Sequence, residues 1–436
     1  MNTVKNYILG NWETGSGSEY TARHAITGAE FATVSSEGLD YKSILDYARS
    51  VGGPALRAMT FQERGRMLKA LALQLTSIKR QFYDVSWATG ATKVDSWIDI
   101  EGGIGNLFAN ASLRRQFPDL PYYVDGELAR LSKEGTFVGH HIMVPRHGVA
   151  VHINAFNFPI WGMLEKIAVN LMAGVPAVVK PSEYTSYLTE VMVKAIIESK
   201  ILPEGSLQLV SGKGRGILEH VDFQDIITFT GSAATGQSLR GLPHLNERSV
   251  PFNLEADSLN AAVMGPDVKP EDPEFALFVR ELANEMTVKS GQKCTAIRRA
   301  MVPEHLLSSV QQAVISRLQK TVIGDPQAEG VRMGALATHD QVGRVEAEMN
   351  KLMAEQELVF NPELNLVGAT GSGAFYSPKL FVNSDPFSNT KVHEIEPFGP
   401  VSTLMPYKTI DEAVQLTAMG RGSLVTSFVS KNTSDI

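Results

Sequence analysis

Hydrophobic and polar residues alternate in blocks between residues 148 and 240, and the blocks predict strands and helices in regular succession. Short apolar runs bounded by glycine or proline are typical of buried strands, whereas longer stretches with apolar residues three or four positions apart are typical of helices. The expected strands are 148–154, 176–180, 207–211 and 226–230, and the expected helices are 159–173, 184–200 and 233–240. This alternation predicts a parallel, doubly wound α/β sheet, which binds ligands beyond the carboxyl ends of its strands.

A second α/β region is predicted to begin near residue 260. Its expected elements are strands 260–264, 296–302 and 423–429, and helices 273–289 and 304–320. Asn432, Thr433, Ser434 and Asp435 are residue types that begin helices, yet the sequence stops at Ile436. We therefore expect that this sequence lacks a C-terminal tail, with a frayed natural terminus as the alternative.

The N-terminal third is expected to be mixed. Residues 1–35 have the pattern of short strands and turns, and residues 40–52 and 60–90 that of helices, the longer one capped by Thr60. Residues 115–146 begin as a polar connection and continue as a strand pair or extended hairpin.

Bulk properties limit the partners. A chain of 436 residues with 43% hydrophobic content is expected to form two or three domains with ample core. The net charge is -7, without a cluster of lysine or arginine, so nucleic acid is not an expected partner. The N-terminus has no signal-peptide pattern, and no apolar run reaches the roughly 20 residues of a membrane span. One cysteine excludes an internal disulfide, and we expect a soluble, cytoplasmic protein.

Cys294 is that single cysteine. A lone cysteine is most often a small buried residue without chemistry. Here, however, the approach through residues 291–293 is polar and flexible, and Arg298 and Arg299 follow. Nearby positive charge lowers a thiol pKa from about 8.5 and so favours the reactive thiolate. The local sequence leaves the reactive and the inert interpretation equally open.

Three other motifs are weak when taken singly. Residues 231–236 join a strand to a helix through glycine, which suits a pyrophosphate, but Gln237 replaces the lysine of a nucleoside triphosphatase loop. Lys180 ends a predicted strand, where it could hydrogen-bond a ribose or simply be solvated. Residues 396–400 form a proline-rich turn that holds one carboxylate and one aromatic ring. No pattern of histidine with cysteine or carboxylate predicts a metal site.

Taken together, the motifs resemble the aldehyde dehydrogenase superfamily, from about residue 5 to the end of the chain. The matching segments, in order, are Asn157-Phe158-Pro159, Lys180-Pro181-Ser182-Glu183, Phe229-Thr230-Gly231-Ser232, Glu255, Gly291-Gln292-Lys293-Cys294 and Glu396-Pro397-Phe398-Gly399-Pro400.

A closer resemblance is to the aldehyde dehydrogenase domain of the bifunctional phenylacetate-degradation family, which joins this enzyme to an oxepin-CoA hydratase. Residues 99–105, 151–159 and 254–260 carry it. No hydratase module is present, so the resemblance implies that a full-length form carries a fused hydratase domain. The chain departs from the wider superfamily at residues 255–259, where Glu-Ala-Asp-Ser-Leu replaces Glu-Leu-Gly-Gly-Lys, and we expect the backbone there to run differently.

The resemblance implies a domain plan. It assigns residues 1–116 and 147–255 to a dinucleotide-binding domain and 256–436 to a second α/β catalytic domain. The remaining segment, 117–146, would be a small β hairpin that mediates homo-oligomerisation.

The resemblance also implies the residue roles. Cys294 is the expected nucleophile, Glu255 the general base and Asn157 a donor to the oxyanion. The expected cofactor-binding residues are Lys180, Ser182, Glu183, Gly231, Ser232, Gly236, Glu396 and Phe398. A carboxylate such as Glu183 repels a 2′-phosphate and favours NAD, whereas the closer resemblance favours NADP, which we take as the expected cofactor.

The expected reaction is oxidation of an aldehyde, namely a CoA-linked semialdehyde of aromatic degradation, to its acid. A generic aldehyde dehydrogenase and a CoA-acylating one are the alternatives within the superfamily. Glu255 argues against the latter, because transfer to CoA needs no water-activating base. A non-catalytic nucleotide-binding scaffold is the alternative of another class, and the presence of Cys294, Glu255 and Asn157 argues against it.

Overall fold

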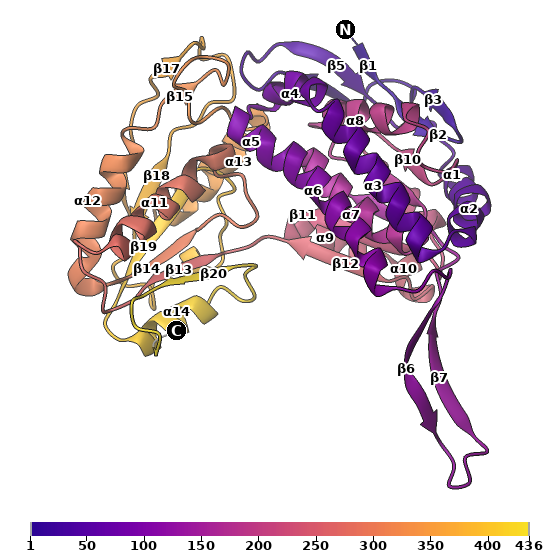
Figure 1. Ribbon diagram of the computed structural model, residues 1–436. Coiled ribbons are helices and arrows are strands. Elements are labelled where there is room, and N and C mark those ends of the chain that lie inside the picture. The colour runs from indigo at the N-terminus through magenta and orange to yellow at the C-terminus, as the bar shows by residue number, and fades with distance from the viewer. Residues whose placement is uncertain (1, 435–436) are drawn as a thin grey trace. The chain divides into compact units, whose positions relative to one another are not determined.

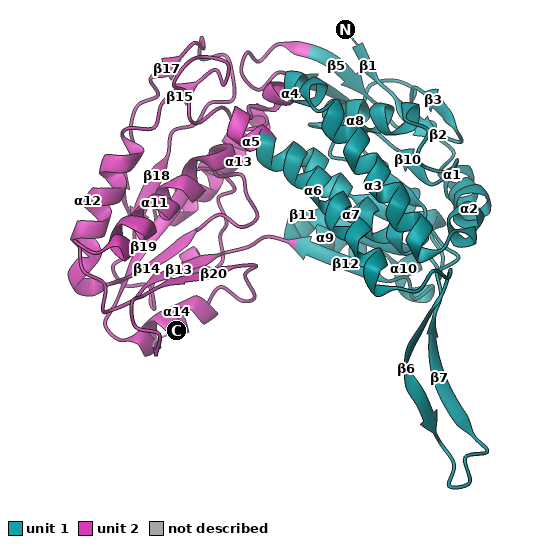
Figure 2. Cartoon of the chain, in the orientation of Figure 1, with its two compact units in different colours: residues 1–22, 31–85, 97–255 teal, residues 23–30, 86–96, 256–436 magenta. Residues whose placement is uncertain are grey.

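The computed structural model describes residues 2–434 and divides into two compact units (Figures 1 and 2). Unit 1 comprises Met1–Ala22, Phe31–Val85 and Trp97–Glu255, and unit 2 comprises Arg23–Glu30, Ser86–Ser96 and Ala256–Ile436. Two short segments from the N-terminal third are therefore part of unit 2, and neither was assigned there from the sequence.

Unit 1 is built on a seven-stranded sheet with the order β12-β11-β8-β9-β10-β2-β3. Its central strands are parallel. Strands β9 and β10 are buried along their whole length, which is typical of a sheet covered on both faces. The strand bounds are β2 Asn6–Ile8, β3 Asn11–Glu13, β8 Ala150–Ile153, β9 Ala177–Lys180, β10 Leu207–Leu209, β11 Ile226–Gly231 and β12 Phe252–Ala256. The four strands expected between residues 148 and 230 are confirmed.

Helices cover this sheet, and the doubly wound α/β fold is thereby confirmed. Helices α3, α6 and α7 pack against one another (Figure 1). The bounds are α1 Tyr41–Tyr47, α2 Gly53–Ala58, α3 Phe61–Ser77, α4 Arg80–Ser86, α6 Gly103–Ser112, α7 Pro159–Met172, α8 Ser186–Glu198, α9 Ala233–Arg240 and α10 Pro243–Glu247. A core of fully buried aliphatic side chains, including Val151, Val178 and Ile227, lies on one face of the sheet.

Helix α3 begins as expected, but the single helix predicted for residues 60–90 is wrong. Thr60 caps α3 through a reciprocal pair of hydrogen bonds with Glu63, a capping box. The helix ends at Ser77, and α4 starts a new one. Leu75 and Phe82 are both fully buried. Their spacing of seven residues also fits one continuous helix, so the break leaves no trace in the hydrophobic pattern.

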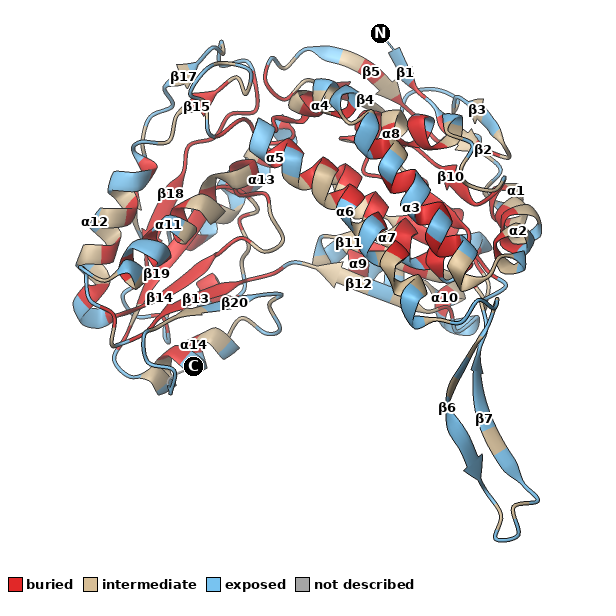
Figure 3. Ribbon diagram, viewed as in Figure 1, coloured by how far each residue is buried: buried red, intermediate tan, exposed pale blue. Residues whose placement is uncertain are grey.

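Two smaller sheets complete unit 1. Strands β1 (Asn2–Val4), β5 (Glu30–Val34) and β4 (Tyr20–Arg23) form one of them. Strands β6 (Tyr123–Arg130) and β7 (Val138–Met143) form an antiparallel hairpin, which confirms the expected strand pair. Most of the hairpin is exposed (Figure 3), and its apolar side chains include Leu128, Leu131, Phe137, Val138, Ile142 and Met143.

Unit 2 is built on a six-stranded sheet with the order β16-β18-β19-β14-β13-β20. All its strand pairs are parallel except that of β16 with β18. The bounds are β13 Ala261–Met264, β14 Arg299–Pro303, β16 Glu357–Phe360, β18 Lys379–Val382, β19 Val401–Tyr407 and β20 Thr426–Val429. The helices are α11 Pro273–Thr287, α12 Leu307–Leu318, α13 His339–Leu352 and α14 Ile410–Ala418, and a further pair of strands is β15 Ile323–Gly324 with β17 Leu366–Val367. A second α/β region is therefore confirmed.

Several bounds in unit 2 differ from those expected. The helix predicted for 273–289 ends at Thr287, because Lys289 and Ser290 adopt left-handed backbone conformations. Residues 432–434 contain no helix in the described chain, and Asp435 lies outside the described residues. Among residues 2–434, no helix combines the length and the apolar character that a membrane crossing requires.

Candidate active site

The expected site residues are divided between the units. Unit 1 holds Asn157, Lys180, Ser182, Glu183, Gly231, Ser232, Gly236 and Glu255, and unit 2 holds Cys294, Glu396 and Phe398. In unit 1 most of these residues lie at or just after the ends of strands, whereas in unit 2 they lie in the segments that precede β14 and β19.

Asn157 lies in unit 1 between β8 and α7 and is 7% exposed. The Asp99 carboxylate accepts hydrogen bonds from the backbone N–H groups of Ile160 and Trp161, at 3.0 and 2.7 Å. These are two of the unpaired donors at the start of α7, so Asp99 acts as a cap supplied from elsewhere in the chain. The segment that carries Asn157 is thereby fixed at the carboxyl end of a central strand.

Lys180 is the last residue of β9, and its burial corrects the interpretation that it is solvated. The residue is 8% exposed, and its Nζ lies 3.6 Å from Glu183 Oε2. Burial lowers the pKa of Lys180, and the charges of Glu183 and Glu19 oppose this effect. Ser182 is also buried. A lysine charge held at a strand end of a doubly wound sheet is placed where such folds bind ligands.

The glycine turn behind β11 begins helix α9. Ser232 caps the helix, with its Oγ accepting a hydrogen bond from Thr235 N–H, and it is exposed. A Cβ added at Gly236 would lie 2.2 Å from Leu254 Cδ1, so a larger residue there would displace that side chain. Packing thus gives Gly236 a structural role, while the exposed helix start at Ser232 is suited to an anion.

Glu255 is linked to a lysine that the sequence analysis did not single out. Thr230 Oγ1 donates to Glu255 Oε2 at 3.2 Å, and Lys166 Nζ donates to Thr230 Oγ1 at 2.9 Å. Lys166 lies within the apolar helix α7, nine residues after Asn157. A lysine in a largely apolar helix was the one sign in the sequence that Lys166 has a special role. Its hydrogen bond to Thr230, and that of Thr230 to Glu255, could not be predicted, because they join segments that meet only in the folded protein.

His152, on strand β8, is fully buried beside this chain. Burial, and secondarily the charge of Lys166, lowers the pKa of His152 to about 3. The imidazole is therefore neutral in the folded protein throughout the physiological range. This agrees with the absence of a partner pattern in the sequence and assigns His152 to the core of unit 1.

The loop before Cys294 in unit 2 is conformationally strained. Lys289, Ser290 and Gly291 have φ angles of 51°, 53° and 69°. The first two are not glycine, and each such left-handed residue costs of order 1 kcal/mol or more. Lys289 N–H donates to Asp95 Oδ1 at 2.7 Å, its Nζ donates to Thr89 Oγ1 at 2.8 Å, and both partners are buried. The segment Ser86–Ser96 thus anchors the strained loop.

The two arginines after Cys294 have different environments, although the sequence suggested the same role for both. Arg299 is fully buried and donates to the carbonyls of Leu259, Leu416 and Thr417. Burial alone lowers its pKa, to about 10, so Arg299 is structural. Burial also lowers the pKa of Arg298, but the negative charges of Glu396, Glu285 and Cys294 oppose that effect. Arg298 is therefore the arginine coupled to the thiol.

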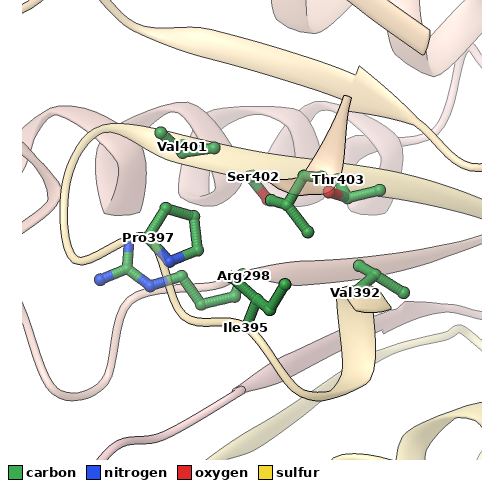
Figure 4. Close-up of a pocket in the computed structure, with 8 residues that line it drawn as sticks. Arg298, Val392, Ile395, Pro397, Val401, Ser402 and Thr403 are labelled. Carbon is green, nitrogen blue, oxygen red and sulfur yellow. The ribbon is translucent and has the colours of Figure 1, made fainter. Parts of the chain in front are cut away.

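Glu396 and Phe398 lie in the turn before β19. The Glu396 side chain is 7% exposed; its Oε2 accepts from Ser258 N–H at 2.9 Å and its Oε1 accepts from Arg298 Nε at 3.3 Å. Burial raises the pKa of Glu396, and Arg298 opposes the increase. The Arg298 guanidinium carbon lies 5.6 Å from the centroid of the Phe398 ring. Figure 4 shows Arg298 beside Pro397 of the same turn.

The described part of the chain contains no group of three or more histidine, cysteine or acidic residues that could hold a metal ion. The same part of the chain holds one thiol, a half-buried carboxylate linked through Thr230 to Lys166, and a buried lysine at a strand end. These are groups for nucleophilic attack, proton transfer and binding of a polar cofactor.

Comparison with known proteins identifies the class. The chain matches the aldehyde dehydrogenase family over residues 12–436. A 3,4-dehydroadipyl-CoA semialdehyde dehydrogenase from Aromatoleum evansii is 40% identical over 431 residues, which cover 98% of this chain and 84% of that protein. The chain therefore belongs to the aldehyde dehydrogenase family, and it is an enzyme of the NAD(P)-dependent aldehyde dehydrogenase class.

Solved structures agree with this fold. An aldehyde dehydrogenase of Mycobacterium tuberculosis, complexed with NAD+, aligns with a TM-score of 0.86 at 24% identity and covers 99% of this chain and 87% of that chain. A 3,6-anhydro-L-galactose dehydrogenase in complex with NADP aligns with a TM-score of 0.85 at 20% identity, over 100% of this chain and 88% of that chain. At these identities the likeness concerns the fold.

Gly291→Ala tests the backbone of the loop that precedes Cys294. Gly291 has a positive φ, and an added Cβ would lie 2.2 Å from Gly399 O, so the loop must move or the unit must lose stability. We expect Gly291→Ala to lower the free energy of unfolding by about 2 kcal/mol or more and to reduce turnover. Gly343→Ala, in α13 with open space around the added methyl, is the control and should stabilise by about 1 kcal/mol. Equal free energies of unfolding for the two variants in urea denaturation would show that the backbone at residue 291 does not require glycine.

His152 predicts a pH dependence of stability. Its folded-state pKa is lowered from 6.5 to about 3, so the unfolded chain binds a proton that the folded chain does not. The contribution of His152 to the free energy of unfolding is complete above pH 6.5 and is lost progressively as the pH falls toward 3. Between pH 7.5 and 5.5 the wild type should lose about 1.4 kcal/mol more than His152→Gln in denaturant titrations. A loss of the same size in both proteins would show that His152 is charged in the fold.

Proposed function

We propose that this enzyme oxidises an aldehyde to a carboxylic acid through a thioester on Cys294, with NADP as cofactor and a CoA-linked semialdehyde of aromatic degradation as substrate. The observation that carries the substrate proposal is the 40% identity, over nearly the whole chain, to a dehydrogenase of 3,4-dehydroadipyl-CoA semialdehyde. The residue proposals below rest on the geometry within each unit and on the sequence motifs.

Cys294 begins the reaction. Its thiolate sulfur adds to the aldehyde carbon, and the carbonyl oxygen becomes an oxyanion that accepts hydrogen bonds from Asn157 Nδ2 and from the backbone N–H of Cys294. Each such donor contributes of order 3 kcal/mol when it is preorganised. The buried, positively charged Arg298 near Cys294 supports the thiolate form.

A bound nicotinamide cofactor would supply the hydride acceptor that oxidation of the Cys294 adduct to a thioester requires. The residues of this chain fit such a group in three respects. Lys180 places a buried positive charge at a strand end, where a ribose or its phosphate can be bound. Ser232 opens an exposed helix start suited to the pyrophosphate. Ser182, Glu183, Gly231 and Gly236 flank these two sites, and in unit 2 Glu396 would hold a ribose and Phe398 would hold the nicotinamide.

Glu255 completes the cycle. Its carboxylate takes a proton from water, the resulting hydroxide adds to the thioester carbon, and the Cys294 thiolate leaves as the acid is released. Thr230 Oγ1, which accepts a hydrogen bond from Lys166 Nζ, donates to the Glu255 carboxylate and holds it in place, and the proton taken from water leaves Glu255 to solvent. A positioned base of this kind contributes roughly 10²–10⁴-fold.

The hairpin β6–β7 is proposed to mediate assembly of a homo-oligomer. Its two strands are exposed and carry a series of apolar side chains that a monomer would leave in water. Residues 1–116 and 147–255 are proposed as the dinucleotide-binding domain and 256–436 as the catalytic domain. A fused hydratase domain in a longer form of the protein remains part of the proposal.

Two variants test the covalent mechanism. Cys294→Ala should abolish turnover, because no other thiol exists in the chain. Glu255→Gln should form one equivalent of NADPH per site in a rapid burst and then turn over at least about 100-fold more slowly, because only thioester hydrolysis needs the base. Stopped-flow absorbance of NADPH measures both. An unchanged steady-state rate for Glu255→Gln would exclude Glu255 as the base, and acyl-CoA rather than free acid as product would favour the CoA-acylating alternative.

Cofactor preference is tested at Glu183. This carboxylate repels a 2′-phosphate, but the nearby Lys180 ammonium offsets part of its charge. We expect a higher kcat/KM for NADP than for NAD, and Glu183→Gln should raise the ratio further by about tenfold, which corresponds to 1.4 kcal/mol. A strong preference of the wild type for NAD in steady-state kinetics would contradict the choice of NADP.

A further inference from the structure

Residue 260 directly follows the segment that departs from the superfamily pattern, residues 255–259, and it contacts the backbone of the nucleophile. Asn260 Nδ2 donates to the carbonyl oxygens of Cys294 and Ala296, at 2.8 and 3.0 Å. Asn260 is fully buried, and its Oδ1 accepts a 2.6 Å hydrogen bond from Ser258 Oγ. Ser258 replaces a glycine of the superfamily pattern, so its hydroxyl supplies a contact that the usual residue lacks.

Arg298 contacts the other side of the nucleophile. Its Nη2 donates to the carbonyl oxygens of Gly291 and Lys293, at 2.8 and 3.4 Å, and its Nη1 donates to Gly399 O at 2.6 Å. The side chain is 2% exposed. Lys293 O belongs to the peptide group whose N–H is that of Cys294. Arg298 therefore binds the peptide before the sulfur-bearing residue, and Asn260 binds the carbonyl after it.

Glu396 connects the two sides. One carboxylate oxygen accepts from Arg298 Nε and the other from Ser258 N–H. The contacts close a ring through Cys294, Asn260, Ser258, Glu396, Arg298 and the Lys293 carbonyl, hereafter the polar ring. All six residues belong to unit 2. A closed set of hydrogen bonds permits less independent motion than the same bonds made separately.

We propose that Arg298, Ser258 and Asn260 are positioning residues that fix the peptide groups on both sides of Cys294 and orient Glu396 toward the cofactor. This inference rests on the proposed function, because positioning of the Cys294 backbone N–H matters only if that group donates a hydrogen bond to the oxyanion.

Two physical consequences follow from the ring. A charged donor on Lys293 O polarises that peptide and strengthens the Cys294 N–H as a donor. The same guanidinium opposes the rise in pKa that burial gives Glu396, and so favours the ionised carboxylate, whose two oxygens both accept hydrogen bonds. Loss of the planar guanidinium fork should therefore reduce turnover even where positive charge is retained.

The first experiment uses the protein without cofactor. Because Cys294 is the sole cysteine, the rate of iodoacetamide alkylation as a function of pH reports this thiol alone. Arg298→Gln, which removes the charge, should raise the midpoint of this profile and slow alkylation at pH 7 by roughly threefold or more. Arg298→Lys, which keeps the charge, should leave the midpoint close to that of the wild type.

The second experiment measures turnover and cofactor binding. Arg298→Lys should lower kcat by about 10- to 100-fold and weaken NADPH binding, followed by fluorescence, because the fork that aligns Lys293 O and Glu396 is lost. Asn260→Asp replaces a donor to Cys294 O by an acceptor of the same shape and should lower kcat by a similar factor. Ser258→Gly keeps the backbone N–H that binds Glu396 and should have the smallest effect of the three.

Arg299→Lys is the matched control, because Arg299 is adjacent and equally buried but contacts neither Gly291, Lys293 nor Glu396. It should lower the melting temperature without moving the alkylation midpoint. The proposal is overturned if Arg298→Gln keeps the wild-type pH profile while Asn260→Asp keeps the wild-type kcat, or if Arg299→Lys shifts the profile as far as Arg298→Gln. If the wild type oxidises no aldehyde, the proposed function fails, whereas the alkylation profiles still decide whether the ring controls the thiol.

Discussion

The guanidinium of Arg298 is the contact on which the arrangement of unit 2 around its thiol depends. It donates to two carbonyls of the strained loop before Cys294, to the turn that carries Phe398, and to the carboxylate of Glu396. The backbone at Lys289 and Ser290 is unfavourable for these residue types, so it requires surroundings that over-determine it. Buried anchors at Asp95 and Thr89 hold one end of that loop, and Arg298 holds the other.

Unit 1 follows a different principle, in which charges and a helix start are presented at the ends of parallel strands. Lys180 ends β9, and Ser232 begins α9 directly behind β11. Glu255 lies in β12, where Thr230 and Lys166 set its direction. The backbone of the sheet determines these positions, whereas the side chains of unit 2 are positioned mainly by one another.

The hydrophobic pattern predicted the parallel strands because each is a short apolar run between turns. It did not predict the break after Ser77, since Leu75 and Phe82 keep helical spacing across it. It also missed the left-handed Lys289, because neither glycine nor asparagine marks that position. Cys294 and Glu255 could be named from their motifs. Lys166 could not, and Arg298 could not be told apart from Arg299, because their importance lies in hydrogen bonds between segments up to 101 residues apart, as for Arg298 and Gly399.

The central claim is that residue 294 carries the acyl group during turnover, and rapid-quench mass spectrometry tests it directly. Enzyme in excess would be mixed with NADP and a CoA-linked semialdehyde, quenched on the millisecond scale and digested. The account predicts that the peptide containing Cys294 gains the mass of the acyl group as NADPH forms and loses it as free acid appears. NADPH formation with an unmodified Cys294 at every quench time would contradict the account.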